Sequence, residues 1–322
     1  MEKNYGDLIK ITYKKLLFRE PDTEGYSHFL NLLKTKQIDE NQFIDMIKNS
    51  DEYRRKLKAD NFNKQENYIF TGTYDLKYHI HPNSILDFLV TQNGICDSLM
   101  INQIKEFISP SDTVFDIGAN AGLLSLPIAK HIVPNGTVYS FEPDPELYVQ
   151  LCENIELNNL QNIIVEQSAL QDDASLKIIK LHKRRAIHDD GRTNFGLSTI
   201  QNNVEYVVGS HFVPTTTIDN FVISKNISNI NLIKIDVEGA EFKVMNGARN
   251  SIRNFHPIIV YEFSREIDKL THTTNTKNCF EFIKQQEYSQ YVILNSKKLQ
   301  LIENYDENLP DSDMLCIPDI SQ

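Results

Sequence analysis

Apolar side chains recur at helical spacing through the first 58 residues of the chain. Between residues 4 and 17 they follow one helical stripe, which the turn residues of 19–25 then interrupt. A second stripe follows, and Asp39 with Gln42 three residues later has the spacing of a capping box at the start of a third helix. We therefore expect a small, wholly helical unit at the front of the chain.

From residue 97 onward, helical patterns alternate with short, continuous apolar runs. Residues 97–107 have the pattern of an amphipathic helix, and the apolar run 113–117 that follows ends at Gly118. Apolar residues resume at helical spacing after Gly122, so the pattern predicts a strand, a tight turn and a helix. Such alternation is typical of an open, mostly parallel sheet that is covered by helices.

Two further strands are predicted in the next part of the chain. Residues 137–141 end at Glu142–Pro143, and an acidic residue at such a strand tip can accept hydrogen bonds from both hydroxyls of a ribose. The third strand and its tip, over 163–170, contain Ser168 and Ala169, which we expect to flank an adenine. Nicotinamide-dependent enzymes make the same ribose contact. The acidic residue therefore predicts a bound nucleoside but does not identify the cofactor.

Two later apolar runs each end at a carboxylate. Residues 231–235 precede Asp236, and 257–261 precede Glu262. Ligands of open α/β sheets lie outside the carboxyl ends of the strands, so we expect both side chains to face the reactive end of a cofactor. There they can serve as a general base and a substrate hydrogen-bond acceptor, or hold a divalent metal; strand-end charges in solvent are the simpler alternative.

Two acids that follow Asp236 fall around the first turn of the next predicted helix. They are Glu238 and Glu241, and the helix dipole favours negative charge at that position. For Glu241 we prefer this structural explanation to a catalytic one.

The turn at 116–122 has the spacing D-x-G-x-x-x-G. A dinucleotide fold requires G-x-G-x-x-G, and here Asn120 stands in place of the second glycine. S-adenosylmethionine (SAM) has no pyrophosphate, and Asp116 can hold the ammonium group of its amino-acid tail directly or through water. Gly118 can adopt backbone angles closed to other residues, and Gly122 lets the helix approach the strand. We expect main-chain N–H groups at the helix N-terminus to lie against the ligand.

Composition narrows the classes of function. The 322 residues carry a formal net charge of −11, and the first 60 are nearly balanced, with 12 Lys/Arg and 11 Asp/Glu. The acidity therefore belongs to the remainder, which argues against a nucleic-acid partner. Four scattered cysteines without a C-x-x-C pair argue against a zinc site or a disulfide framework. The start lacks an apolar signal-like core and no apolar run approaches roughly 18 residues, so we expect a cytoplasmic protein without a transmembrane segment.

A charged insertion lies where a substrate loop is expected, over residues 183–192. Arg184, Arg185 and Arg192 can pair with a phosphate or carboxylate on the acceptor, although a solvated loop also explains them. His188 and His211 are weaker base candidates than the strand-end carboxylates, because a lone loop histidine is more often a surface residue.

These motifs resemble two known families. The pattern L-x-R-x-P-D-x-x-G over 17–25, with S-D-E-Y at 50–53, resembles a small helical family of unknown function that recurs beside glycan-processing domains. Roughly residues 100–322 resemble the FkbM-type methyltransferases, in the segments Phe115–Gly122, Phe141–Pro143, Asn194–Thr199, Thr217–Asp219 and, most distinctively, Ile233–Glu241. The second resemblance implies a SAM-dependent fold and, usually, O-methylation of a hydroxyl, often on a sugar or another secondary metabolite.

We therefore predict a small helical domain at 1–60 and, over 61–322, an α/β domain with the mostly parallel, seven-stranded Rossmann-like sheet of class I methyltransferases. The predicted catalytic residues are Asp236 and Glu262, and no metal ligand is assigned. The predicted cofactor is SAM, with contacts at Asp116, Gly118, Ala119, Asn120, Gly122, Glu142, Pro143, Ser168 and Ala169.

The predicted function is O-methylation of a hydroxyl on a sugar or glycan. The acceptor is a small molecule or a glycan, and the helical unit is available to dock a partner. A catalytically inactive SAM-binding scaffold and, less favoured, a nicotinamide-dependent oxidoreductase are the alternatives.

Overall fold

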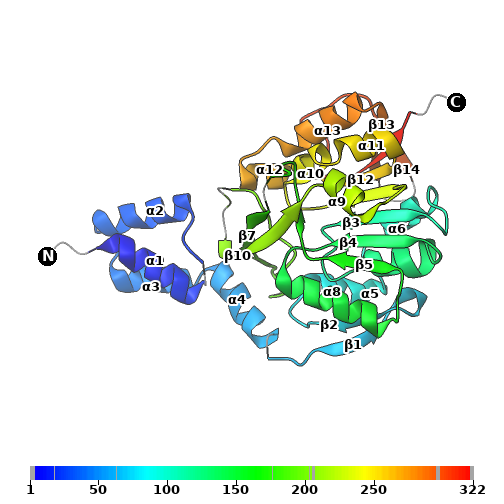
Figure 1. Ribbon diagram of the computed structural model, residues 1–322. Coiled ribbons are helices and arrows are strands. Elements are labelled where there is room, and N and C mark those ends of the chain that lie inside the picture. Colours follow the sequence, from blue (N-terminus) through cyan, green and yellow to red (C-terminus); the bar gives the residue numbers. More distant parts are fainter. Residues whose placement is uncertain are drawn as a thin grey trace.

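The computed structural model describes residues 4–17, 19–62, 64–175, 177–202, 204, 207–294 and 298–319. A unit of helices at the N-terminal end projects from a larger α/β part (Figure 1). None of the helices in these ranges is long and apolar enough to cross a membrane.

The expected helices at the front of the chain are present. They are α1 (Tyr5–Leu16), α2 (Thr23–Lys34), α3 (Glu40–Lys48) and α4 (Asp51–Phe62). The first three pack around their own apolar cluster, with Ile9, Leu33 and Phe43 at its centre. The predicted capping box of α3 is confirmed, since the side chains of Asp39 and Gln42 each accept a hydrogen bond from the other's backbone N–H.

The motif of the helical family is used for internal packing. The guanidinium of Arg19 pairs with Glu52 at 2.6 Å and with Asp22 at 3.2 Å, and it lies 5.1 Å from the ring centre of Tyr13. Asp22 also caps α2 by accepting the N–H of Gly25 at 2.7 Å. These contacts join the α1–α2 turn to the start of α4, so the motif residues have a structural role. Phe18, beside Arg19 in the chain, lies outside the described residues.

The larger part is built on one eight-stranded sheet. In spatial order its strands are β14 (Lys298–Ile302), β13 (Tyr288–Leu294), β15 (Ser312–Pro318), β12 (Ile258–Phe263), β11 (Leu232–Ile235), β3 (Thr113–Ile117), β4 (Thr137–Phe141) and β5 (Ile163–Glu166). The five from β12 to β5 are parallel, and β15, β13 and β14 are joined by antiparallel pairing. The predicted fold class is confirmed, and β14 adds an eighth strand at the edge.

Helices cover both faces of this sheet, as the alternation of the strands requires (Figure 1). In β3, Phe115 and Ile117 face one apolar cluster and Val114 faces another. The first cluster is closed by α9 (Ile218–Lys225), α10 (Glu241–Asn246), α11 (Arg249–Phe255) and α13 (Asn275–Gln285). The opposite face is closed by α5 (Ile85–Asn93), α6 (Ser98–Lys105) and α8 (Pro145–Leu157).

The predicted third strand is divided between two sheets. Residues 163–166 form β5, and the chain then leaves the main sheet, so that β6 (Ala169–Leu170) pairs with β10 (Val207–Thr216). A long hairpin with β7 (Ile178–Arg184) completes this second, three-stranded sheet. Two shorter hairpins are β1 (Tyr68–Thr71) with β2 (Lys77–Ile80), and β8 (Ala186–Ile187) with β9 (Thr193–Asn194).

The charged insertion joins the helical unit to the α/β part. Asp189 accepts hydrogen bonds from Arg55 of α4 at 2.9 Å and, through its carbonyl, from Lys58 at 2.8 Å. The guanidinium of Arg192 lies over the rings of Phe62 in α4 and Phe88 in α5, at 4.7 and 3.6 Å from their centres. The two parts are therefore held together by specific contacts as well as by the chain between them.

Candidate active site

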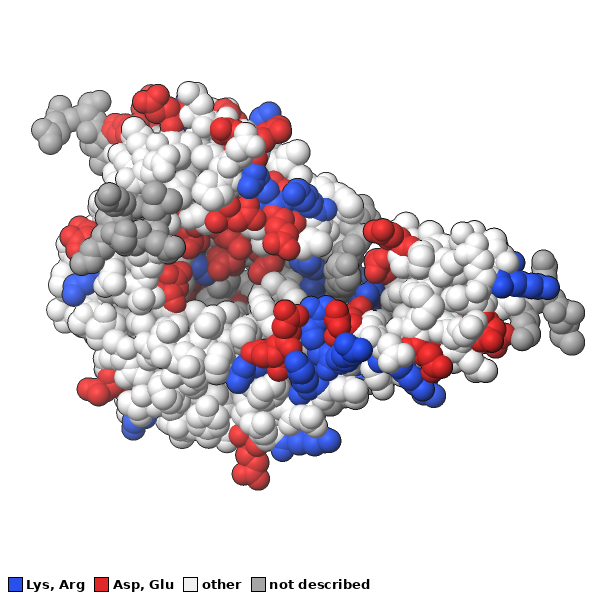
Figure 2. Space-filling view, turned by 180° about the vertical axis from the view of Figure 1, so that it is seen from behind, with Lys and Arg blue, Asp and Glu red and all other residues white. Residues whose placement is uncertain are grey.

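A cavity of about 330 Å³ opens at the carboxyl ends of β3, β4, β11 and β12. Ligands of open α/β sheets occupy this position, and the volume suits a small molecule. Figure 2 shows this side of the molecule as a hollow in which acidic side chains gather. All the predicted site residues except Asp116 and Gly122 line it, namely Gly118, Ala119, Asn120, Glu142, Pro143, Ser168, Ala169, Asp236 and Glu262.

Glu142 is fixed in the cavity wall by the backbone. Its two carboxylate oxygens accept the N–H groups of Asn120 and Asp144, each at 2.8 Å. Burial raises the pKa of Glu142 to about 7, against the lowering effect of these two bonds. A carboxylate has about four lone-pair positions, so two remain for the hydroxyls of a ribose.

The glycine turn has the expected backbone, with φ of +80° at Gly118 and +83° at Gly122. A Cβ at Gly118 would lie 1.7 Å from the carbonyl oxygen of Asp236, so this position admits only glycine without a backbone shift. A Cβ at Gly122 would meet Leu126 and Leu151 at 2.4 and 2.6 Å. Gly122 therefore allows close packing of α8 against the turn, while Gly118 allows β3 and β11 to meet at the cavity floor.

The N–H groups of the glycine turn itself are bonded within the chain, and the expected contact of a ligand with N–H groups at the helix N-terminus stays a prediction. The N–H groups of Gly118 and Ala119 both donate to the carbonyl of Phe141 at 3.0 Å, and that of Asn120 is taken by Glu142. The turn therefore folds back onto the end of β4. It leads into the short helix α7 (Ser125–Pro127) and the π-helical turn η2 (Ile128–Ile132), and the N–H of Leu126 already donates to the carbonyl of Gly122 at 3.0 Å.

Asp116 lies outside the cavity lining, in a buried polar group beneath the turn. Its Oδ2 accepts the hydroxyl of Ser125 at 2.5 Å, and its Oδ1 lies 3.4 Å from the ammonium of Lys234. Lys234 also donates to the carbonyl of Gly118 at 3.0 Å and lies 3.4 Å from Asp236. Burial lowers the pKa of Lys234, but the carboxylates of Asp236 and Asp116 outweigh it and hold that pKa above its usual value.

Lys234 thus connects the glycine turn, at Gly118, to Asp236, the predicted catalytic carboxylate. It was missed as a site residue in the sequence, where the available signal is a lysine within the otherwise apolar strand 232–235. A charged side chain in the centre of a sheet is rare unless paired, so it marks a polar site at this edge.

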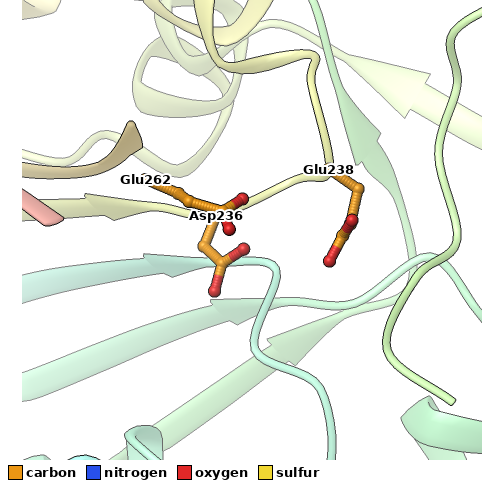
Figure 3. Close-up of side chains that lie close together, drawn as sticks. All are labelled: Asp236, Glu238 and Glu262. Atoms are coloured by element: carbon orange, nitrogen blue, oxygen red, sulfur yellow. The ribbon is translucent and has the colours of Figure 1, made fainter. Parts of the chain in front are cut away.

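Asp236 and Glu262 meet as predicted. The strands β11 and β12 are parallel with Ile235 opposite Tyr261, so the residues that follow them emerge side by side. Glu238 joins this pair, and each of the three residues places one carboxylate oxygen within 4.8 Å of the others (Figure 3).

Two further acids line the cavity beside this group, Asp97 and Asp313. Burial and neighbouring carboxylates raise the pKa values of Glu238 and Glu262 well above normal, and that of Asp313 to about 7. The reactive end of the cavity is therefore rich in carboxyl groups, several of which lose their protons less readily than usual.

The placement of Glu238 in a helical turn is wrong, because α10 begins only at Glu241. Glu241 itself has the predicted structural role. One of its carboxylate oxygens accepts the N–H groups of Val237 and Gly239 at 2.9 and 3.3 Å, and the other accepts the amide of Asn275 at 2.5 Å. It holds the loop that carries Asp236 and Glu238.

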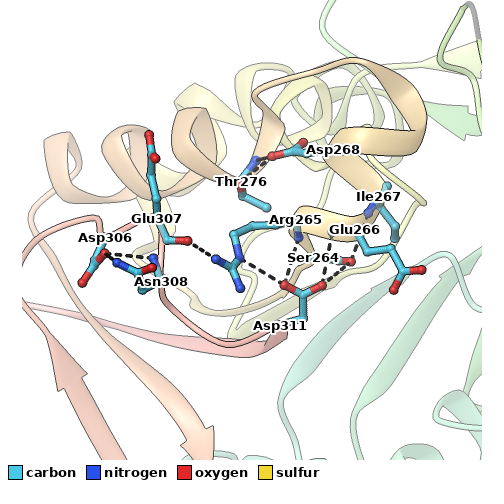
Figure 4. Close-up of polar contacts among 10 residues, drawn as sticks. All are labelled: Ser264, Arg265, Glu266, Ile267, Asp268, Thr276, Asp306, Glu307, Asn308 and Asp311. Atoms are coloured by element: carbon cyan, nitrogen blue, oxygen red, sulfur yellow. Dashed lines mark hydrogen bonds and ion pairs between the residues drawn. The ribbon is translucent and has the colours of Figure 1, made fainter.

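The segment after Glu262 is held in a similar way (Figure 4). Asp311 accepts the backbone N–H groups of Arg265 and Glu266 at 3.1 and 3.2 Å, at the start of α12 (Arg265–Thr271). Asp268 in α12 accepts the hydroxyl of Thr276 in α13 at 2.5 Å. The strand end that carries Glu262 is thereby anchored to the neighbouring helices.

The basic side chains of the insertion already have partners within the chain. Arg185 lies 3.4 Å from Glu146 and stacks over the ring of Phe195 at 4.7 Å, and Lys183 pairs with Glu146 at 2.6 Å. Neither His188 nor His211 lines the cavity. Among the base candidates, Asp236 and Glu262 are therefore the ones that reach it.

The residues of the cavity fit the cofactor expected from the sequence. Small residues leave space along the floor, a carboxylate suits the ribose on one side, and acids suit the positively charged sulfonium and ammonium groups. The family model of the methyltransferase FkbM domain matches residues 116–289, more than half of the chain. A domain of unknown function, DUF4214, matches residues 3–57.

Three relatives illustrate the similarity. "Methyltransferase 1" of Beauveria bassiana is 30% identical over 148 residues, which are 43% of this chain and 59% of the relative. The hexuronic acid methyltransferase AglP of Haloferax volcanii is 26% identical over 50% of this chain and 60% of its own length. The 31-O-demethyl-FK506 methyltransferase FkbM of Streptomyces tacrolimicus is 26% identical over 45% and 62%.

The chain spans about three-fifths of the length of these curated relatives. Among solved structures, a methyltransferase FkbM from Methylobacillus flagellatus superposes on 65% of this chain and 44% of its own, with 16% identity and a TM-score of 0.39. The match of the family model over more than half of the chain is decisive: the chain belongs to the FkbM methyltransferase family, whose cofactor is SAM.

Proposed function

We propose that this chain transfers the methyl group of SAM to a hydroxyl of a sugar or glycan, with Asp236 as the general base. The observation that carries this proposal is the position of Asp236. Its side chain lines the cavity at the end of β11, is 44% exposed, and is held 3.4 Å from the buried Lys234. A base in this position can reach a substrate, whereas Asp116, fully buried on the other side of Lys234, cannot.

The orientation of SAM follows from the two ends of the cavity. The carboxylate of Glu142 would accept the ribose hydroxyls, and Ser168 with Ala169 would border the adenine. The sulfonium end then points toward Asp236 and Glu262. Asp116 would act on the ammonium group of SAM through water, because its carboxylate does not line the cavity.

Methyl transfer from a sulfonium is an in-line displacement. The bond from the acceptor oxygen to the methyl carbon forms while the bond from sulfur to that carbon breaks, leaving S-adenosylhomocysteine. Asp236 takes the proton of the weakly acidic hydroxyl as the new bond forms, an effect worth about 10²–10⁴ in rate. Lys234 positions this carboxylate, and Glu262 can accept a second hydrogen bond from the acceptor.

Two relatives support different parts of this proposal. One is described as a hexuronic acid methyltransferase, which supports a sugar-like acceptor, and the name of the other, 31-O-demethyl-FK506 methyltransferase, supports transfer to an oxygen. We propose the helical unit as a separate domain over 1–60. None of its described residues lines the cavity, and it would serve as a docking module for a glycan or protein.

The test compares binding with turnover in Asp236→Asn. We expect methyl transfer from labelled SAM to a panel of hexuronic acids and their glycosides to fall at least about 100-fold, with SAM affinity within about threefold of wild type. Glu266→Gln, an exposed acid on α12, is the matched control. Equal losses of affinity and turnover would make Asp236 a binding residue, and SAM binding without transfer to any hydroxyl would favour the scaffold.

A further inference from the structure

The proposed methyl transfer gives a role to two of the three carboxylates that meet at the end of the cavity, Asp236 and Glu262, and leaves Glu238 without one. Asp236, Glu238 and Glu262 come from two strand ends and one loop, and Figure 3 shows their side chains close together. Three carboxylate oxygens within 4.8 Å of one another repel strongly in a partly buried site. Such an arrangement is stable when a positive charge lies among them.

The protein supplies only part of that charge. The ammonium of Lys234 lies 3.4 Å from Asp236, but it is shared with Asp116 at the same distance on its other side. Arg184 contributes a favourable longer-range charge toward Glu238, while Glu241, Asp97 and Asp313 add negative charge around the group. When all three carboxylates are ionised, the described residues around them therefore leave an excess of negative charge.

Glu238 is the side chain that points to a ligand. Its carboxylate is buried, its Oε2 has no hydrogen-bond partner among the residues that the structure describes, and it lies close to the carboxylates of Asp236 and Glu262 (Figure 3). Buried carboxylate oxygens are ordinarily satisfied by donors, and leaving one without a partner is unfavourable. Glu241, the next acid along the chain, has both of its carboxylate oxygens hydrogen-bonded. Of the two acids, Glu238 is therefore the one with an oxygen available to a ligand.

We propose that Asp236, Glu238 and Glu262 bind one divalent cation of the hard, oxygen-preferring class, Mg²⁺ or Mn²⁺, at the reactive end of the cavity. Carboxylate oxygens without nitrogen or sulfur ligands select this class. Three protein oxygens leave coordination positions for water and for an oxygen of the acceptor. If the proposed function holds, the cation would polarise the acceptor hydroxyl next to Asp236 and so help it lose its proton.

The site is tested by titrating metal-free protein with Mn²⁺ alone and measuring free Mn²⁺ by electron paramagnetic resonance. We expect one Mn²⁺ bound per chain, displaced by excess Mg²⁺. Glu238→Gln keeps the shape of the side chain but removes the charge, and it should weaken Mn²⁺ binding at least about tenfold. Glu262→Gln provides a second ligand variant, and Glu266→Gln, an exposed acid outside the cluster, should bind as wild type.

Circular dichroism and thermal unfolding of each variant establish that it is folded. If Glu238→Gln does not fold, a folded Glu262→Gln still tests the proposal. Absence of stoichiometric Mn²⁺ binding, or equal affinity in wild type and in both ligand variants, would overturn the proposal. Methyl transfer that persists at the full rate in a chelator, together with no Mn²⁺ binding, removes the cation site and leaves the proposed function intact. Stoichiometric Mn²⁺ binding without transfer to any hydroxyl removes the proposed function and leaves the cation site.

Discussion

Replacing Gly118 by alanine tests whether the cavity floor is built as described. The residue has φ of +80°, and an added Cβ would lie 1.7 Å from the carbonyl oxygen and 2.9 Å from the carbonyl carbon of Asp236. Both atoms are backbone, at the junction of two central strands, so the contact cannot be relieved by rotating a side chain. The strain must be spread over β3 and β11, which also displaces Asp236.

The expected magnitude combines two terms. Placing alanine in a left-handed conformation costs about 1–2 kcal/mol, and overpacking at a rigid contact costs about a further 1–3 kcal/mol, giving roughly 2–5 kcal/mol in the free energy of unfolding. For a domain of this size that lowers the melting temperature by roughly 4–20 °C. Gly118→Val should lower the free energy of unfolding at least as much as Gly118→Ala.

The assay is urea unfolding followed by circular dichroism, with SAM affinity measured by calorimetry on the folded variant. Gly209→Ala in β10 is the matched control, because a Cβ there meets no atom of the described residues within 4 Å and the backbone is not left-handed. It should change stability by less than about 0.5 kcal/mol. If Gly118→Ala unfolds at the same urea concentration as wild type, β3 and β11 do not meet at Gly118 as we describe.

Two further predictions concern the helical unit and the ribose contact. Arg19→Ala removes the ion pairs with Glu52 and Asp22 and should destabilise the helices by about 2 kcal/mol, seen as earlier proteolysis of residues 4–58, whereas an unchanged cleavage rate would show that the motif is not structural. Burial raises the pKa of Glu142 to about 7, above its unfolded value, so its contribution to stability is present at low pH and is lost as the pH rises through about 7. Over the same interval the carboxylate that we propose for the ribose contact forms, so SAM affinity measured by calorimetry should rise from pH 6 to pH 8. A flat profile in wild type would contradict the ribose contact, and Glu142→Gln should flatten it.

The sequence predicted those parts of the site that depend on regular elements. Asp236 and Glu262 were expected to be neighbours because each follows a buried apolar run, and parallel strands place such residues at one edge. Glu142 was expected at the cavity for the same reason. In each case periodicity fixes the strand, and the strand fixes the direction in which the next residue emerges.

The parts that depend on irregular backbone could not be predicted in this way. Glu238 has φ of +56°, in a loop that Glu241 holds from the far side, so helical spacing misplaced it. The N–H groups of Gly118, Ala119 and Asn120 donate to Phe141 and Glu142, a contact that depends on how the turn folds back onto β4 and that the spacing of the residues does not show. Lys234 acquires its role only when β3 and β11 bring Asp116 and Asp236 to either side of it.

The central claim is that this cavity accepts SAM and not a dinucleotide, and calorimetric titration of the full chain with SAM and with NAD tests it most directly. We predict that SAM binds at one molecule per chain, that Glu142→Gln weakens this binding, and that NAD gives no heat of binding. Saturable binding of NAD with no binding of SAM would contradict the account.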